Sequence, residues 1–226
     1  MKLVSTFIVI VLGVVFTFAQ ERVIDKEEFD LALKGTDQHK TKWKGQSYRL
    51  SVETSSKQDG KPDSDHSASM LIEFGPDRNT RSVLISRSGD SSTTQETRSL
   101  GDKTYSRTNG GPWVTKERKA ASASDRKPDE AGPFITISAD ATYFYLGERP
   151  FKEAAATVYR KVENTKEVFR STGVESTSVC TTEYWLVDGI QRRHDLTCQH
   201  RRPAQIANNV VNQTWDLDPT IVFKAP

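Results

Sequence analysis

Two cysteines, four histidines and 30 scattered acidic residues are the side chains with which this chain could do chemistry. The histidines are His39, His66, His194 and His200, and none of them lies in the His-x-x-x-His or His-Glu-x-x-His pattern of zinc sites. His194 and His200 share a predicted strand but are about 20 Å apart along it, too far for both to bind one metal ion. We therefore expect no metal site and no cofactor.

The sequence also lacks the motifs that identify common catalytic centres. It has no Gly-x-Ser-x-Gly nucleophile elbow, no phosphate-binding glycine loop and no dinucleotide fingerprint. A glycosidase pair of carboxylates needs no fixed spacing in sequence, but no particular pair is indicated. The sequence predicts no catalytic residue and a protein that is not an enzyme, with an unrecognised hydrolase as the least favoured alternative.

The two cysteines flank a turn signal at Asp188-Gly189. If the hairpin loop has three residues, Val187 pairs with Gln191, and the same register puts Cys180 opposite Cys198. A non-hydrogen-bonded antiparallel pair has its Cα atoms about 4.5 Å apart, which suits a disulfide. A two-residue turn would slip the pairing by one residue and strain the bridge. We expect the disulfide and the three-residue loop, with two free buried thiols as the alternative.

The N-terminus is typical of a secretory signal peptide over residues 1–19. A basic Met1-Lys2 precedes an apolar run over residues 3–18, and the small residues Thr17 and Ala19 fit the −3 and −1 positions of a cleavage site. An uncleaved anchor is the alternative, but the run is shorter than the ~20 residues that span a bilayer. We expect export in a bacterium, to the periplasm or the medium, with no stable membrane span after cleavage.

The mature chain, residues 20–226, has nearly balanced charge. Loss of Lys2 reduces 32 basic residues to 31, against 30 acidic ones. This balance gives no overall attraction to nucleic acid or to anionic membranes, so we expect no nucleic-acid partner. We expect a single domain, interrupted at residues 116–133 by a long exposed loop that is rich in Lys, Ser, Asp and Pro.

The mature chain begins with a predicted helix. Asp25 is a candidate N-cap and Glu28, three residues later, can complete a capping box. Phe29, Ala32 and Leu33 then share one helical face before Gly35 weakens or ends the helix.

Short segments with alternating apolar and polar residues follow, separated by turns at intervals of about ten residues. This pattern predicts a mainly β protein with an antiparallel meander sheet and few other helices. The segment 134–137 fits either a strand or a helix. The predicted strands are 48–53, 70–74, 83–88, 93–100, 103–108, 112–115, 134–137, 142–146, 155–162, 177–187, 190–200, 210–217 and 220–223.

Several of these strands are apolar on both faces. Trp113 adjoins Val114, Tyr143 adjoins Phe144, and Trp185 adjoins Leu186. Such a strand lies either in a sandwich core or in a curved sheet whose concave side is covered. Both interpretations fit these pairs.

The order of four segments resembles the LolA/LppX-like superfamily of bacterial periplasmic lipoprotein carriers and lipid-binding proteins. The resemblance covers most of the mature chain and implies an unclosed, strongly curved antiparallel half-barrel with helices in its mouth. It also implies an apolar ligand such as an acyl chain, whereas the lipidation cysteine of some members is missing. The segments are 72–78, 101–113, 145–159 and 184–189, with 221–226 as a terminal strand.

The leading hypothesis is a non-enzymatic, extracytoplasmic protein that holds a lipid or lipoprotein acyl chain on the concave face of its sheet. The alternative is a protein-interaction or envelope-scaffold domain with an envelope protein as its partner and no small-molecule ligand. The residues expected to contact the ligand are apolar or aromatic members of predicted strands. They are Leu50, Val52, Ile72, Phe74, Ile85, Tyr105, Trp113, Tyr145 and Trp185.

Overall fold

The computed structural model describes residues 21–61, 65–76, 79–117, 134–203 and 205–226. The expected signal peptide and most of the expected loop at 116–133 lie outside these residues. The first two residues of that loop belong instead to a short strand.

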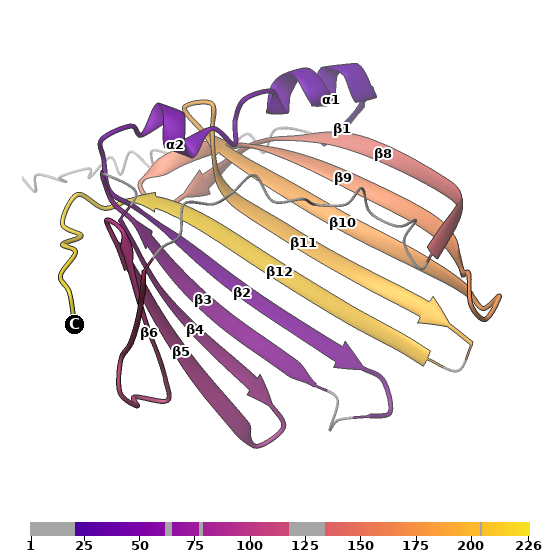
Figure 1. Cartoon of the computed structure of the whole chain (residues 1–226). Helices are drawn as coiled ribbons and strands as arrows, with labels where there is room; N and C mark the ends of the chain where they lie inside the picture. The colour runs from indigo at the N-terminus through magenta and orange to yellow at the C-terminus, as the bar shows by residue number, and fades with distance from the viewer. Residues whose placement is uncertain (1–20, 62–64, 77–78, 118–133, 204) are drawn as a thin grey trace, which may run out of the picture.

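The described chain forms one sheet of twelve strands and two short helices (Figure 1). The helices are α1 (Lys26–Leu33) and α2 (His39–Lys42). The strands are β1 (Arg22–Ile24), β2 (Tyr48–Gln58), β3 (His66–Phe74), β4 (Thr80–Ser88), β5 (Ser91–Leu100), β6 (Lys103–Thr108), β7 (Val114–Glu117), β8 (Phe134–Phe151), β9 (Ala154–Phe169), β10 (Glu175–Val187), β11 (Ile190–Arg202) and β12 (Gln205–Leu217).

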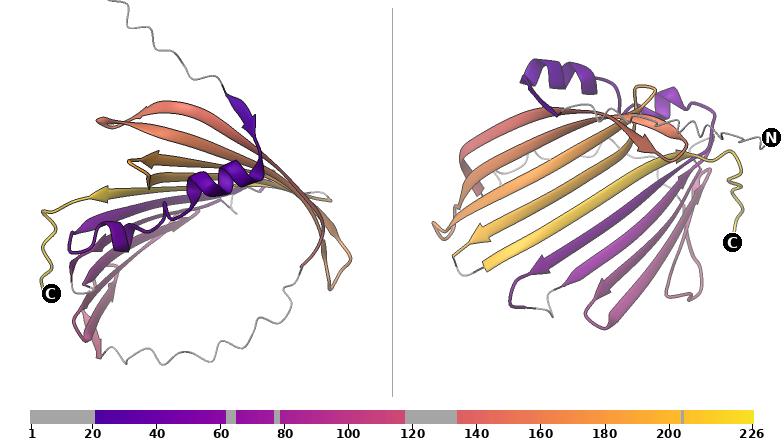
Figure 2. Two further views of the ribbon diagram at one scale, coloured as in Figure 1. Left: turned by 90° about the horizontal axis from the view of Figure 1, so that it is seen from above. Right: turned by 180° about the vertical axis from the view of Figure 1, so that it is seen from behind.

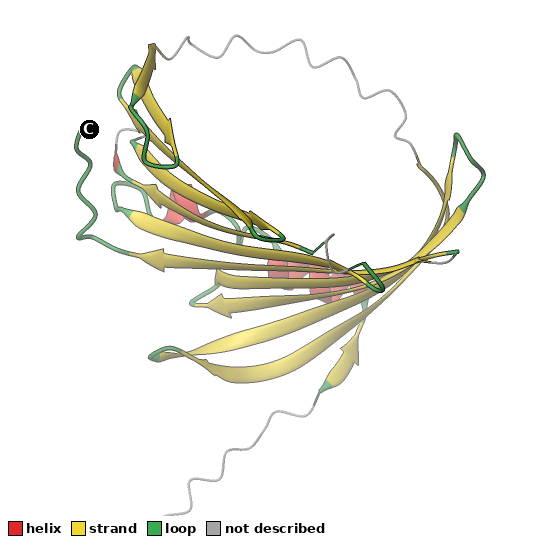
Figure 3. Ribbon diagram, turned by 90° about the horizontal axis from the view of Figure 1, so that it is seen from below, coloured by secondary structure: helices red, strands yellow, loops and turns green. Residues whose placement is uncertain are grey.

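The sheet consists of two meanders joined at their ends. The strand order is β1-β8-β9-β10-β11-β12-β2-β3-β4-β5-β6-β7, and every neighbouring pair is antiparallel. Pairing of β12 with β2 places the two meanders side by side in the centre. The sheet is bent into a trough and does not close, because β1 and β7 remain at its edges (Figure 3). The expected mainly β, unclosed antiparallel fold with few helices is confirmed.

Helix α1 begins where the sequence predicts. The Asp25 side chain accepts a hydrogen bond from the Glu28 backbone N–H at 2.7 Å, as an N-cap does. The Glu28 carboxylate does not complete a capping box, because it forms an ion pair with Arg22 instead. Gly35 has a φ of +70° just after the helix, in the left-handed region that glycine occupies without strain.

The cysteine hairpin forms the predicted disulfide, but with a different loop from the one predicted. Cys180 pairs with Cys198, the two are bonded, and their Cα atoms are 4.1 Å apart. The loop, however, has only the two residues Asp188 and Gly189, both with positive φ as in a type I′ turn. A β-bulge at Arg192 adds one residue to β11 and restores the register that a three-residue loop would have given.

Two further expectations are settled by the structure. Residues 134–137 lie in strand β8 and not in a helix. Residues 220–223 form no strand, since the chain after β12 leaves the sheet as a tail. The Phe223 ring of this tail lies against Gly75, where a Cβ atom would be only 2.2 Å from the ring.

Candidate functional site

The concave face of the sheet can be identified from the strand register. Residues opposite each other on neighbouring strands share a face, and alternate residues of one strand lie on opposite faces. One face presents Leu196 of β11 and Thr93 of β5, five strands apart, and both line one hollow. Only the inner side of a bent sheet can bring side chains so far apart along the sheet into one hollow, so this is the concave face.

Helix α1 covers one end of this concave face (Figure 2). The Phe29 ring is buried against three tyrosine rings, with centroid distances of 4.8 Å to Tyr143, 6.4 Å to Tyr159 and 5.8 Å to Tyr184. Edge-to-face and tilted packing of this kind stabilises aromatic clusters beyond the area they bury. Burial raises the pKa of the Tyr184 and Tyr159 hydroxyls, since the charged phenolate loses hydration there.

Helix α2 covers the neighbouring part of the same end. The buried His39 ring stacks on Trp215 of β12 at 4.8 Å, and Trp43 packs on Tyr48 at 5.3 Å. Tyr48 in turn stacks on Phe74 at 4.6 Å, and burial raises the pKa of the Tyr48 hydroxyl. The two helices and the aromatic rings beneath them therefore close this end of the trough with a packed plug.

Beyond the plug, the concave face becomes aliphatic. Val52 pairs with Met70, and Met70 pairs with Leu84, which places all three on the floor of the trough. Leu196 pairs with Val211 on the other side of the β12–β2 junction. We call this group the aliphatic belt; its members are Leu50, Val52, Met70, Ile72, Leu84, Leu196 and Val211.

The other end of the trough contains two adjoining hollows of about 650 and 500 Å³. The larger hollow begins at the aliphatic belt, at Leu196 and Val211, and passes Ala68 and the buried Cys198 of the disulfide. These volumes lie within the range of small-molecule sites. The residues that line both hollows are Ser56, His66, His200 and Asn209.

The outer parts of the hollows are lined by hydroxyl, amide and imidazole groups. Among the residues that the structure describes, these side chains form no hydrogen bond with another part of the protein. They are Ser56, His66, Ser86, Ser88, Ser91, Thr93, His200 and Asn209. Their hydrogen-bonding capacity is therefore free for water or a ligand.

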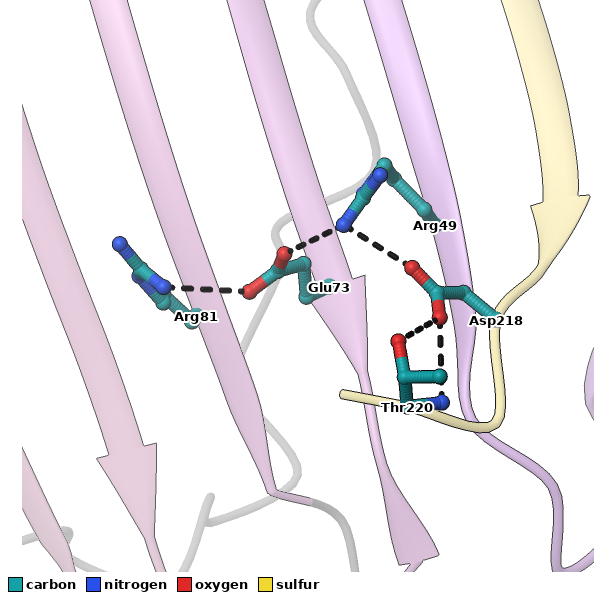
Figure 4. Close-up of polar contacts among 5 residues, drawn as sticks. All are labelled: Arg49, Glu73, Arg81, Asp218 and Thr220. Carbon is teal, nitrogen blue, oxygen red and sulfur yellow. Dashed lines mark hydrogen bonds and ion pairs between the residues drawn. The ribbon is translucent and has the colours of Figure 1, made fainter. Parts of the chain in front are cut away.

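On the convex face, many of the charged groups pair with one another. Glu73 lies between Arg49 at 3.0 Å and Arg81 at 3.6 Å, and Arg49 also contacts Asp218 at 3.0 Å (Figure 4). Hydrogen bonds from the Thr220 hydroxyl and backbone N–H lower the pKa of Asp218.

Further ion pairs and a hydrogen bond continue across the convex face. They are Arg107–Glu96, Arg160–Glu183, Arg193–Asp195 and Gln199–Asn208. A smaller hollow of about 240 Å³ also lies against this face and is lined by Glu53, Ser67, Ile85, Arg87 and Asn212, among others.

The predicted ligand-contact residues divide between the two faces. Five lie on the concave face: Leu50, Val52, Ile72, Phe74 and Tyr145. Four lie on the convex face: Ile85, Tyr105, Trp113 and Trp185. Of the concave five, Phe74 belongs to the aromatic plug and the first three belong to the aliphatic belt.

Of the four convex residues, Trp113 and Trp185 pack among arginines and apolar neighbours, whereas Ile85 lines the small convex hollow. The Trp113 ring lies 4.8 Å from the Arg98 guanidinium and 4.6 Å from that of Arg107. Trp185 packs on the small cluster of Phe151, Ala156 and Val187. These arrangements resemble local structural packing more than a ligand site.

The structure also shows concave residues that the sequence did not single out. Leu84 was missed because Val83, Leu84 and Ile85 are all apolar, so alternation cannot tell which of them faces inward. Pairing of Leu84 with Met70 decides it. Leu196 was missed because it is an isolated apolar residue among polar neighbours, although it has the same parity as the disulfide cysteine Cys198. Val211 was missed because it adjoins Val210, so alternation cannot tell which of the two faces inward.

The described residues contain no group of three or more His, Cys, Asp or Glu side chains placed to hold a metal ion. Within the same residues, neither helix is long and apolar enough to cross a bilayer.

Comparison with known proteins yields a remote structural likeness. No family model matches the sequence, and no curated protein matches it. The structure is similar to that of a LolA superfamily protein from Nitrosomonas europaea, with a TM-score of 0.28 and 8% sequence identity. The match covers 86% of this chain and 94% of the other. That protein belongs to the superfamily that the order of the sequence segments resembles.

Proposed function

We propose that this protein is a non-enzymatic, extracytoplasmic binding protein that holds the acyl chain of a lipid or lipoprotein in its trough. The observation that supports this most directly is the larger hollow, which opens from the aliphatic belt on the concave face. An acyl chain laid along the belt would remove its own methylene groups and those of the protein from water, which yields about 0.8 kcal/mol for each buried CH₂.

Two features of the molecule support the same function. The aromatic plug stops the trough at one end, which gives a bound chain a defined depth. The two hollows of the concave face, of about 650 and 500 Å³, are also larger than the hollow of about 240 Å³ on the convex face. As a single exported domain, the protein would act in an oxidising compartment, where a disulfide such as Cys180–Cys198 persists.

Native mass spectrometry of the gently purified protein tests the proposal. We expect a co-purified species with the mass of a lipid, or, after delipidation, saturable binding of a fluorescent fatty acid. A protein that carries no lipid and does not bind the fluorescent probe would refute the proposed function.

A further inference from the structure

The trough is graded along its length. On β2 the concave residues run from Tyr48 through Leu50 and Val52 to Ser56 and then Gln58. The neighbouring strand β3 shows the same order, from Phe74 to His66. One end is therefore aromatic, the middle aliphatic and the far end polar.

A ligand that is only a hydrocarbon would leave the polar end of the trough empty. The hydroxyl, amide and imidazole groups that line this end form no hydrogen bonds within the described protein. If an apolar chain covered these groups, each would lose its water without replacement, at a cost in affinity. A ligand that fits the whole trough is therefore an amphiphile with its chain in the belt and its headgroup between His66 and His200.

Charge in the two hollows excludes a strongly anionic headgroup. The smaller hollow has one cation, Arg202, and one carboxylate, Glu167. The Arg202 guanidinium also lies over the Phe169 ring at 4.6 Å. Among the described residues that line the larger hollow, Arg87 alone carries a permanent charge, and it lies on the convex face of β4. Sites for phosphate normally converge several cations on the ligand, and no such cluster is present in this described part of the trough.

Hydrogen-bond chemistry points to the class of headgroup. Ser and Thr hydroxyls and the Asn209 amide can each both donate and accept hydrogen bonds. An ionised phosphate or carboxylate only accepts, so it would leave half of that capacity unused. A hydroxyl of a sugar or of glycerol both donates and accepts, which matches the lining. We propose that the polar end of the trough binds the uncharged, hydroxyl-rich headgroup of an amphiphile such as a glycosylated diacylglycerol; this rests on the proposed function of the trough.

Competition binding with three lipids that have identical acyl chains tests the inference. The lipids are diacylglycerol, monoglucosyl-diacylglycerol and phosphatidylglycerol, each displacing a fluorescent fatty acid from the full mature chain. We expect the glucosyl lipid to bind tighter than diacylglycerol by at least tenfold, and phosphatidylglycerol to bind no tighter than diacylglycerol. Equal binding of all three, or a preference for phosphatidylglycerol, would overturn the headgroup site while the proposed function stands. Failure of all three lipids to displace the bound probe would overturn the headgroup site, whereas failure of the protein to bind the fluorescent fatty acid itself would overturn both.

Variants locate the headgroup on the protein. Asn209→Leu should reduce the preference for the glucosyl lipid about fivefold, the equivalent of one net hydrogen bond, and leave diacylglycerol affinity unchanged or improved. His200→Leu should do the same from the neighbouring strand. Asn212→Leu is the matched control, because this residue lies on the convex face of the same strand. Unchanged preference in both concave variants, with native circular dichroism, would overturn the site.

Discussion

Truncation of Leu196 to alanine should weaken the binding of an acyl chain without unfolding the sheet. Leu196 lies on the concave face at the entrance of the larger hollow. The change removes three carbon atoms, each worth about 0.8 kcal/mol if the bound chain covers it, or about 2.4 kcal/mol in total. This corresponds to a Kd increased by up to about 50-fold. Val211→Ala removes two carbons from the neighbouring strand and should increase the Kd by up to about 15-fold.

The assay is titration of the delipidated protein with a fluorescent fatty acid. Val179→Ala is the matched control, because Val179 belongs to the same hairpin as Leu196 but lies on the convex face with 46% of its surface exposed. We expect the control to bind like the unmodified protein. If Leu196→Ala and Val211→Ala both keep a Kd within twofold of the unmodified protein while they remain folded, the acyl chain does not lie along the belt.

Replacement of Cys180 and Cys198 by alanine should lower the free energy of unfolding by about 3 kcal/mol in urea denaturation, given a separation of 18 residues, and a loss under 1 kcal/mol would contradict this. Gly75→Ala should displace the Phe223 ring and make the tail easier to digest with carboxypeptidase, as followed by mass spectrometry; a Phe223→Ala background should abolish the effect. Burial raises the pKa of Tyr184 in the folded protein. The free energy that its protonated form contributes to folding is therefore fully present below the pKa of about 10 that the phenol has in the unfolded chain. That contribution is lost as the pH rises through the folded pKa. Alkaline unfolding curves should therefore be shallower for Tyr184→Phe, and identical curves would contradict the linkage.

Local features of this protein were accessible from its sequence. Alternation located most strands, the Asp25 cap located the start of α1, and Asp188-Gly189 located the hairpin that brings the cysteines together. Each of these depends on residues close to one another along the chain, where backbone geometry and side-chain period decide the outcome. The loop of that hairpin was predicted one residue too long, because a bulge at Arg192 and a longer loop give the same pairing of Cys180 with Cys198.

The candidate site was accessible only in part. Leu50, Val52 and Ile72 could be predicted, since clear alternation on β2 and β3 puts them on one face. Trp185 could not be placed, because its strand is apolar on both sides and a shift of one residue in register exchanges the faces. The polar hollows could not be predicted at all, since serines and histidines on a strand look the same in sequence whether they face solvent or a cavity.

By itself the sequence determined most of the segments that become strands, most of the turns between them and which cysteines pair. These outcomes follow from interactions among neighbours in the chain. The tertiary structure alone decided that β12 lies beside β2, that the joined meanders bend into a trough and that the belt lies on its inner side. Those outcomes depend on contacts between residues far apart in the chain, such as Trp215 and Leu50, which are 165 positions apart and whose pairing no local pattern encodes.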